Sequence, residues 1–145
     1  MLFRSLEERL TRELHLQDHV HLLGMIPHDQ LPPYLALAEI AVVPSLVEAS
    51  SIFMLEAMAM AKPVIATNAG GLPEILTPSA GILVEPMDEI GLADAILELL
   101  RNKEKRLRLG EQAYHHVKEN YSWKAIAQQM ESEYMRLLTE KNRRK

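Results

Sequence analysis

Residues 44–74 read PSLVEASSIFMLEAMAMAKPVIATNAGGLPE, and this stretch decides how the chain folds. Between Ile52 and Ala61 the only polar side chain is Glu56. A helix that is apolar on every side is a buried helix, so the pattern predicts one here. Because a buried carboxylate is costly unless it is satisfied, we expect Glu56 to face a polar cleft or hydroxyl groups.

Residues 20–23 are expected to form a short strand closed by Gly24, and short unbroken apolar runs recur at residues 40–43, 63–66 and 81–84. Such runs are typical of parallel strands that are covered on both faces. They alternate with segments of helical periodicity, and this alternation indicates an α/β fold. The sequence therefore predicts a Rossmann-like parallel sheet of about four strands with flanking helices.

Apolar spacing and capping residues place the other helices. We expect them over about 3–16 and 29–38, in a short turn from Pro73, and over 90–100, 103–119 and 123–138, with Ser122 as the cap of the last. Residues 87–145 would then form the helical C-terminal third of a single domain that spans 1–145.

Composition excludes several classes of protein. The chain has 145 residues and is 48% apolar, which is ample for a packed core. Its formal net charge is −4 and its one basic run is at 141–145, which argues against a nucleic-acid binder. It has no cysteine and no apolar run of about twenty residues, so we expect no disulfide, no membrane span and a cytoplasmic location.

No metal site is expected. The six histidines show no metal-ligand spacing with nearby acids, and two of them are adjacent, so that a helix would direct them apart. The methionines of the apolar helix are interpreted as core filling rather than as ligands of a cofactor.

Polar residues before the apolar helix predict an anion site. Either Ser50 or Ser51 could cap the helix, which would leave free amides at about residues 51–53 pointing out of its N-terminus. The loop from Ser45 to Ser51 follows a strand, and open α/β sheets bind ligands at the carboxyl ends of their strands. Glu48 lies on this loop and is therefore a candidate site residue.

Gly70 and Gly71 follow the next strand. Paired glycines permit a positive φ or the close approach of backbone to a ligand, and a simple tight turn is the alternative. Pro73 and Glu74 then suit the first turn of a short helix, so Glu74 has a structural explanation.

At these residues the chain resembles the nucleotide-sugar-binding domain of GT-B-fold retaining glycosyltransferases, the glycogen-synthase-like superfamily often called family 4. The shared pattern is Pro-Ser after a strand, two glutamates separated by seven residues, Ala-Met-Ala, Pro-Val-Ile-Ala and Gly-Gly-x-Pro-Glu, all present between Pro44 and Glu74. Further matches are Leu23-Gly24 and Tyr121-Ser-Trp123, so the resemblance covers about residues 1–138.

The resemblance implies a donor site for a nucleoside diphosphate sugar, whose sugar is transferred to an acceptor with retained configuration. Glu48 would lie beside the donor sugar as the catalytic position, and Glu56 would bind the ribose hydroxyls. Amides near Ser50, Ser51 and Ile52 would meet the diphosphate, and the turn at 70–71 would line the cleft. No metal and no further cofactor are implied.

The chain departs from the family pattern in three ways. Ser50 and Ser51 replace an aromatic residue and a glycine, and Ala61 replaces a glycine that ends the helix, at a cost of up to about 1 kcal/mol if its φ is positive. Relatives also have two earlier strands with a basic pair for the phosphates, and a preceding acceptor domain. We therefore expect a chain that is inactive alone and joins a partner domain or a second copy; the alternative is a non-catalytic truncated or split module.

Overall fold

The computed structural model describes residues 2–143, which fall into two compact units, one ending at Tyr34 and one beginning at Leu35. Met1 and the last two residues of the basic terminal run, Arg144 and Lys145, lie outside the described residues. Each unit is described by itself.

The first unit contains α1 (Leu2–Glu13), the 3₁₀ turn η1 (His28–Gln30) and the start of α2 (Leu31–Leu37). Helix α1 ends earlier than the spacing predicts because His15 adopts a φ of 55°. The amides of His15 and Leu16 then donate to the carbonyls of Arg12 and Thr11, at 3.1 and 2.9 Å, which is the bonding of a Schellman motif.

The strand expected at Val20–Leu23 is not formed. Residues 20–27 have no regular secondary structure, and the side chains of Val20 and Leu23 are 38% and 54% exposed. A strand is stable only when a neighbour pairs with its backbone, and an apolar run by itself does not supply that neighbour.

The second unit is built on three parallel strands in the order β1-β2-β3 rather than on about four. These are β1 (Ala41–Val43), β2 (Val64–Thr67) and β3 (Gly81–Val84). All four residues of the central strand β2 are buried, and three of them, Val64, Ile65 and Ala66, belong to the unbroken apolar run that predicts a covered strand. Among the described residues β1 pairs with β2 alone, so its other edge is open.

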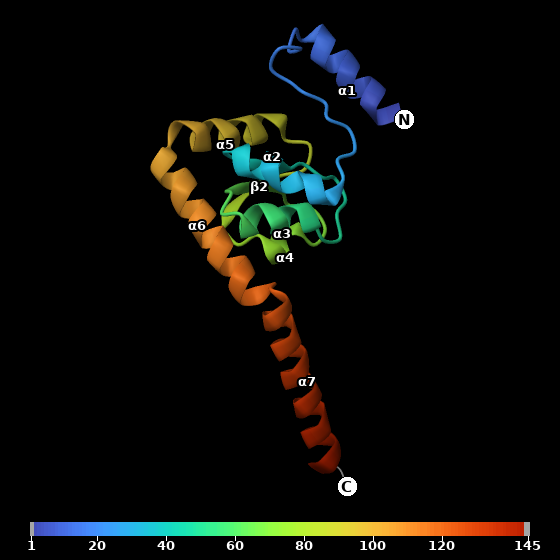
Figure 1. The fold of residues 1–145 in the computed structure, drawn as a ribbon, viewed down its shortest axis with the longest axis vertical. Coiled ribbons are helices and arrows are strands. Elements are labelled where there is room, and N and C mark those ends of the chain that lie inside the picture. The colour runs from blue at the N-terminus through green and yellow to red at the C-terminus, as the bar shows by residue number, and fades with distance from the viewer. Residues whose placement is uncertain (1, 144–145) are drawn as a thin grey trace. The chain divides into compact units, whose positions relative to one another are not determined.

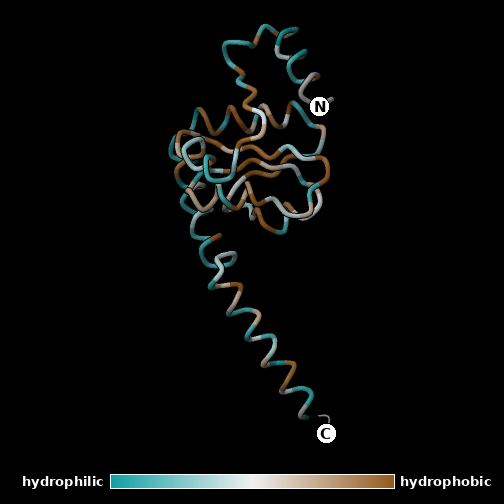
Figure 2. The backbone as a smooth tube through the Cα atoms, turned by 45° about the vertical axis from the view of Figure 1, so that its right-hand side comes forward, coloured by the Kyte–Doolittle hydropathy of each residue, from teal (hydrophilic) through white to brown (hydrophobic). Residues whose placement is uncertain are grey.

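Helices cover both faces of this sheet. Figure 1 shows α5 (Glu89–Arg101) on one side of β2, and α3 (Ile52–Ala59) and α4 (Leu72–Ile75) on the other. Under α5 the core consists of Ile65, Ala95, Leu99 and Leu109, with partly buried apolar side chains packed around them. The tube in Figure 2 is most apolar along the strands, in agreement with this placement of the core.

Side-chain caps define helices α5 and α6 (Lys103–Asn120). Asp88 accepts from the amide of Gly91 at 2.8 Å, and Asn102 accepts from the amide of Lys105 at 2.9 Å. Arg106 donates to the carbonyls of Leu99 and Leu100, at 2.8 and 3.1 Å, and its guanidinium lies 2.6 Å from Glu39. These contacts satisfy orphan groups at the junction of the two helices and fix its geometry.

Helix α3 ends in a second Schellman motif. The amides of Ala61 and Lys62 donate to the carbonyls of Met58 and Ala57, both at 2.9 Å. Ala61 stands in place of the helix-ending glycine and has a φ of 55°. This is the left-handed region, in which alanine is strained. Lys62 also donates to the carbonyl of Ala36 at 2.8 Å, which places its charge at the C-terminal end of α3.

We expect Ala61→Gly to raise the free energy of unfolding by about 0.5–1 kcal/mol, because glycine adopts a positive φ without a steric penalty. Urea unfolding of the two proteins measures the difference. The matched control is Ala59→Gly, in the last turn of the same helix and also exposed, where glycine should destabilise by up to about 1 kcal/mol. Changes of the same sign at both positions would contradict the strain assigned to Ala61.

Helix α6 crosses the end of α3 at very short range. Gly110 is buried, and a Cβ atom built on it would lie 2.1 Å from the carbonyl oxygen of Ala61 and 3.4 Å from Cδ of Pro63. The first distance is far below any van der Waals contact. Only glycine at this position allows the two helices to approach so closely.

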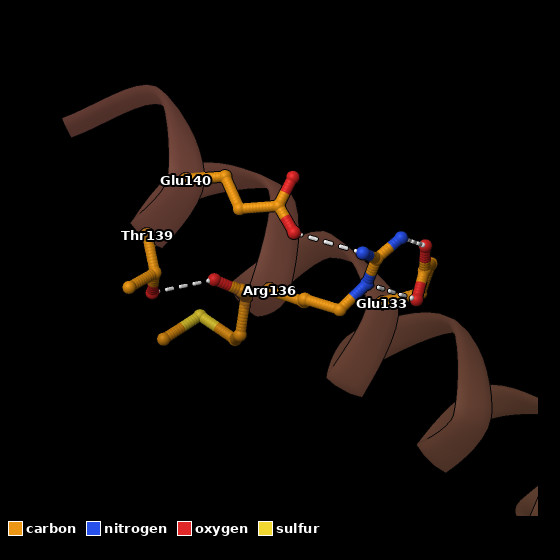
Figure 3. Close-up of polar contacts among 5 residues, drawn as sticks. Glu133, Arg136, Thr139 and Glu140 are labelled. Atoms are coloured by element: carbon orange, nitrogen blue, oxygen red, sulfur yellow. Dashed lines mark hydrogen bonds and ion pairs between the residues drawn. The ribbon is translucent and has the colours of Figure 1, made fainter. Parts of the chain in front are cut away.

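Helix α7 (Trp123–Arg143) begins where Ser122 accepts from the amide of Ala125 at 3.2 Å, as the sequence predicts. Its described side chains from Ala127 to Lys141 are exposed, and Figure 2 shows isolated apolar positions among polar ones. In Figure 3 Arg136 joins Glu133 and Glu140, and the hydrogen bond from Arg136 lowers the pKa of the Glu133 carboxyl. Pairs at this spacing stabilise an exposed helix locally.

None of the described helices combines the length and apolar character that crossing a bilayer requires. The cytoplasmic location stays a prediction.

Candidate functional site

The loop between β1 and α3 leads into a capped helix N-terminus. Ser51 is 7% exposed, and its hydroxyl accepts from the amide of Met54 at 3.2 Å, so Ser51 rather than Ser50 is the cap. Amides at the start of a helix point out of its N-terminus, and the helix dipole makes that end attractive to anions. Ser50, directly before the cap, is exposed.

The turn at Gly70 and Gly71 packs against this loop. The amide of Gly71 donates to the carbonyl of Glu48 at 2.9 Å, and Gly70 has a φ of 53°. A Cβ atom on Gly70 would lie 2.0 Å from the Glu48 oxygen, and one on Gly71 would lie 2.1 Å from the Ala49 oxygen. Gly70 must be glycine because of its positive φ and of the close approach, and Gly71 because of the close approach alone. The backbone that approaches both is that of the Glu48 loop.

Thr67 joins the same two segments at the end of β2. It is 4% exposed, and its hydroxyl donates to the carbonyl of Ser45 at 2.5 Å. Sequence reasoning missed this residue, because a threonine at the end of an apolar strand carries no signal of its own. The structure thus brings together Glu48, the α3 N-terminus and the Gly70-Gly71 turn at the carboxyl ends of β1 and β2.

Glu56 is half-buried and lines an open hollow of about 460 Å³ beside the end of α6. The other lining residues are mainly apolar or aromatic: Leu55, Ala59, Tyr114, Val117, Lys118, Tyr121, Ser122 and Trp123. The lining is thus mainly apolar, and the polar partner expected for Glu56 stays a prediction. Glu48, Ser50, Ser51, Ile52 and the two glycines do not line this hollow.

Two hydrogen bonds hold the end of α6 against α4. Nε2 of His116 lies 3.0 Å from the carbonyl oxygen of Ile75, and the hydroxyl of Tyr121 donates to the carbonyl of Glu74 at 3.2 Å. Because a carbonyl can only accept, Nε2 is the donor in this hydrogen bond. These bonds fix the α6 wall of the hollow that Glu56 lines.

A second hollow, of about 250 Å³, opens at the carboxyl ends of the strands on the α5 side. Its charged lining is Glu85, Asp88 and Glu89, and Asn68 donates to Glu85 at 3.1 Å. Three carboxylates disfavour a phosphate group in this hollow.

Helix α3 is less buried than its composition predicts. Met54, Ala57 and Met58 are buried, whereas Ile52 is 67% exposed. Leu46 and Val47 on the preceding loop are 61% and 90% exposed. The apolar sequence shows that each side of this helix could be buried. It does not show which sides have another part of the protein packed against them.

Within residues 2–143 no cluster of three or more His, Asp or Glu side chains has a geometry that could hold a metal ion.

The family described as Glycosyl transferases group 1 matches residues 4–116. The chain is 36% identical over 129 residues to MMP alpha-(1->4)-mannosyltransferase of Mycolicibacterium hassiacum, covering 88% of this chain and 31% of that protein. It is 34% identical to N-acetyl-alpha-D-glucosaminyl L-malate synthase of Bacillus anthracis, covering 90% of this chain and 34% of that protein. The chain thus spans about a third of the length of these relatives.

Solved structures agree. Sucrose-phosphate synthase from Thermosynechococcus elongatus superposes with a TM-score of 0.84 and 37% identity, over 95% of this chain and 35% of that one. The C-terminal domain of a glycosyl transferase group 1 family protein from Francisella tularensis gives 0.77 and 29%, over 85% of this chain and 64% of that one. HepE of Anabaena, solved in complex with UDP, gives 0.81 and 26%, over 92% and 36%.

Proposed function

Because the chain belongs to the glycosyl transferases group 1 family, we propose that it is the donor-binding part of a retaining glycosyltransferase that uses a nucleoside diphosphate sugar. One observation carries the proposal: the Glu48 loop, the capped N-terminus of α3 and the Gly70-Gly71 turn meet at the carboxyl ends of β1 and β2. Open α/β sheets bind their ligands at that edge.

Each part of this arrangement suits one part of the donor. The amides near Ser50, Ser51 and Ile52 would donate to the diphosphate, with the dipole of α3 adding to the attraction. Glu48 would lie beside the sugar. Glu56, one turn into α3, would accept from the ribose hydroxyls, and the turn at 70–71 would line the cleft. The structure of HepE with UDP supports a nucleotide ligand for this fold.

The chemistry follows from where charge develops. As the bond between the anomeric carbon and the diphosphate breaks, its electron pair goes to the leaving oxygen, and the amides at the α3 N-terminus would stabilise that charge. The acceptor hydroxyl attacks the same face of the sugar and gives its proton to the departing diphosphate. Configuration at the anomeric carbon is thereby retained.

The isolated chain should bind its donor weakly and transfer no sugar. No basic side chain lies among the described residues that form the proposed diphosphate site, and the charge of Lys62 is at the other end of α3. Charge-assisted hydrogen bonds to phosphate are the strongest contacts, so without them we expect an affinity of roughly millimolar or weaker. Because these residues match about a third of the length of the relatives, we place the acceptor site in the remaining part of such a protein.

Association with a further domain is the second part of the proposal. Leu46, Val47 and Ile52 expose apolar surface beside the candidate site, and no strand among residues 2–143 pairs with the outer edge of β1. Apolar surface and an unpaired strand edge both favour a partner. Because the relatives are about three times longer, we propose an acceptor-binding domain as that partner, with a second copy of the chain, or a purely non-catalytic module, as alternatives.

An amide-resolved NMR titration with uridine, guanosine and adenosine diphosphates tests the donor site. We expect one nucleotide at millimolar concentration to shift the amides of residues 50–56 and of Gly70 and Gly71. Glu56→Ala should weaken this binding by about tenfold or more, because it removes charged hydrogen bonds to the ribose. Glu131→Ala, at an exposed position of α7, should leave it unchanged. If no nucleotide shifts any of these amides in the wild type, the chain has the fold of the family but does not bind a nucleotide donor, and the proposal is wrong.

A further inference from the structure

The loop from Pro44 to Ser50 has no helix or strand of its own, yet its backbone is held at several points. At its start, the hydroxyl of Thr67 donates to the carbonyls of Ser45 at 2.5 Å and Val43 at 3.4 Å. Thr67 is 4% exposed, and a buried hydroxyl without a partner would be costly. The hydroxyl of Thr67 therefore holds the backbone at Ser45, directly after the end of β1.

Further along the same loop, the amide of Gly71 donates to the carbonyl of Glu48 at 2.9 Å. Gly70 and Gly71 leave no room for a Cβ atom against the carbonyls of Glu48 and Ala49. The segment 67–71 thus lies against three successive parts of the loop. The contacts that Thr67, Gly70 and Gly71 make with this loop are with its backbone, so they hold the backbone of Glu48 and do not involve the Glu48 carboxylate.

We propose that the segment Thr67–Gly71 positions the Glu48 loop, and that Thr67 is a positioning residue for donor binding. The part of this inference that concerns the donor rests on the proposed function above. A loop that is already ordered loses less conformational entropy when a ligand binds, so a preorganised loop binds more tightly. Thr67 would contribute to affinity without touching the donor.

A purely structural role for Thr67 predicts something different. A hydroxyl that only stabilises the sheet would, when removed, raise hydrogen exchange throughout β1, β2 and β3 together. A positioning hydroxyl would, when removed, raise exchange at the amide of Gly71 and shift the resonances of residues 45–51, while the strand amides keep their protection. The two roles are therefore separable without any ligand.

The test compares Thr67→Val, which keeps the shape and removes the hydroxyl, with Thr67→Ser, which keeps the hydroxyl. Thr139→Val is the matched control, because Thr139 also donates to a carbonyl, that of Met135 at 2.9 Å, but on exposed α7 (Figure 3). We expect Thr67→Val to speed exchange at Gly71 by about tenfold and to weaken UDP binding by about fivefold. Thr67→Ser and Thr139→Val should resemble the wild type.

Unchanged exchange at Gly71 and unchanged resonances at 45–51 in Thr67→Val would overturn the proposal, as would a uniform rise over all three strands. If the loop loosens but UDP binds equally well, the role in donor binding is overturned. If the loop loosens and the wild type shows no shifts with uridine, guanosine or adenosine diphosphate, the positioning of the loop stands and the proposed function fails. A wild type that responds to a nucleotide other than UDP is compared with the variants in that nucleotide. Should Thr67→Val not fold, Thr67→Ser and Thr67→Ala differ by the hydroxyl and supply the same comparison.

Discussion

Replacing Gly110 with alanine is expected to lower the free energy of unfolding by about 1–2 kcal/mol, and to do so although alanine is the better helix former. Alanine favours an exposed helix interior by up to about 1 kcal/mol over glycine. At Gly110, however, the added Cβ atom would lie 2.1 Å from the carbonyl oxygen of Ala61. Because that oxygen belongs to the backbone, α6 itself must shift away from α3, and overpacking of this kind costs about 1–3 kcal/mol.

Thermal or urea unfolding of Gly110→Ala measures the loss. The control is Glu111→Ala at the neighbouring exposed position of α6, which should stay within about 0.5 kcal/mol of the wild type. Equal stability of the two variants would mean that the helices do not approach as closely as the structure has them.

Gly70→Ala should combine a loss of stability with a displaced Glu48 loop. The φ of 53° would place alanine in the left-handed region, at a cost of roughly 1–2 kcal/mol. Its Cβ atom would also lie 2.0 Å from the carbonyl oxygen of Glu48, so the loop must move to make room. We expect a total loss of about 3 kcal/mol, with displaced amide resonances over residues 45–51.

Gly70→Asn separates the two causes. Asparagine tolerates a left-handed φ better than alanine but carries the same Cβ atom. If the collision with Glu48 dominates, both variants lose nearly equal stability in urea unfolding and displace the same loop resonances. A variant with alanine at this position that keeps both wild-type stability and wild-type resonances would refute the close contact.

Local signals predicted much of the second unit. The apolar runs at 40–43, 63–66 and 81–84 place the three strands to within one residue, and the cap at Ser122 is where the sequence puts it. These features depend on residues that are close along the chain. Capping and short apolar runs are local properties, so a single sequence contains them.

Features that depend on distant residues were not predictable in the same way. The run at 20–23 has the composition of a strand, but whether it forms one depends on a neighbour. Gly70 and Gly71 were interpreted as permitting a positive φ or the approach of a ligand, or as a simple tight turn. The approach that the structure shows, by the backbone of the Glu48 loop, appears only when the two loops are placed together. Thr67 likewise gains its role from the carbonyl of Ser45, twenty-two positions earlier.

The hollow that Glu56 lines also contains Trp123, whose fluorescence can report on this place. Trp123 is the single tryptophan of the sequence, is 88% exposed and forms part of the same wall as Tyr121. The emission of an indole depends on its contact with water, so the fluorescence of the unlabelled chain reports on this one place. A ligand or partner that covers Trp123 in this hollow can be followed by the tryptophan fluorescence in real time, without introducing a dye.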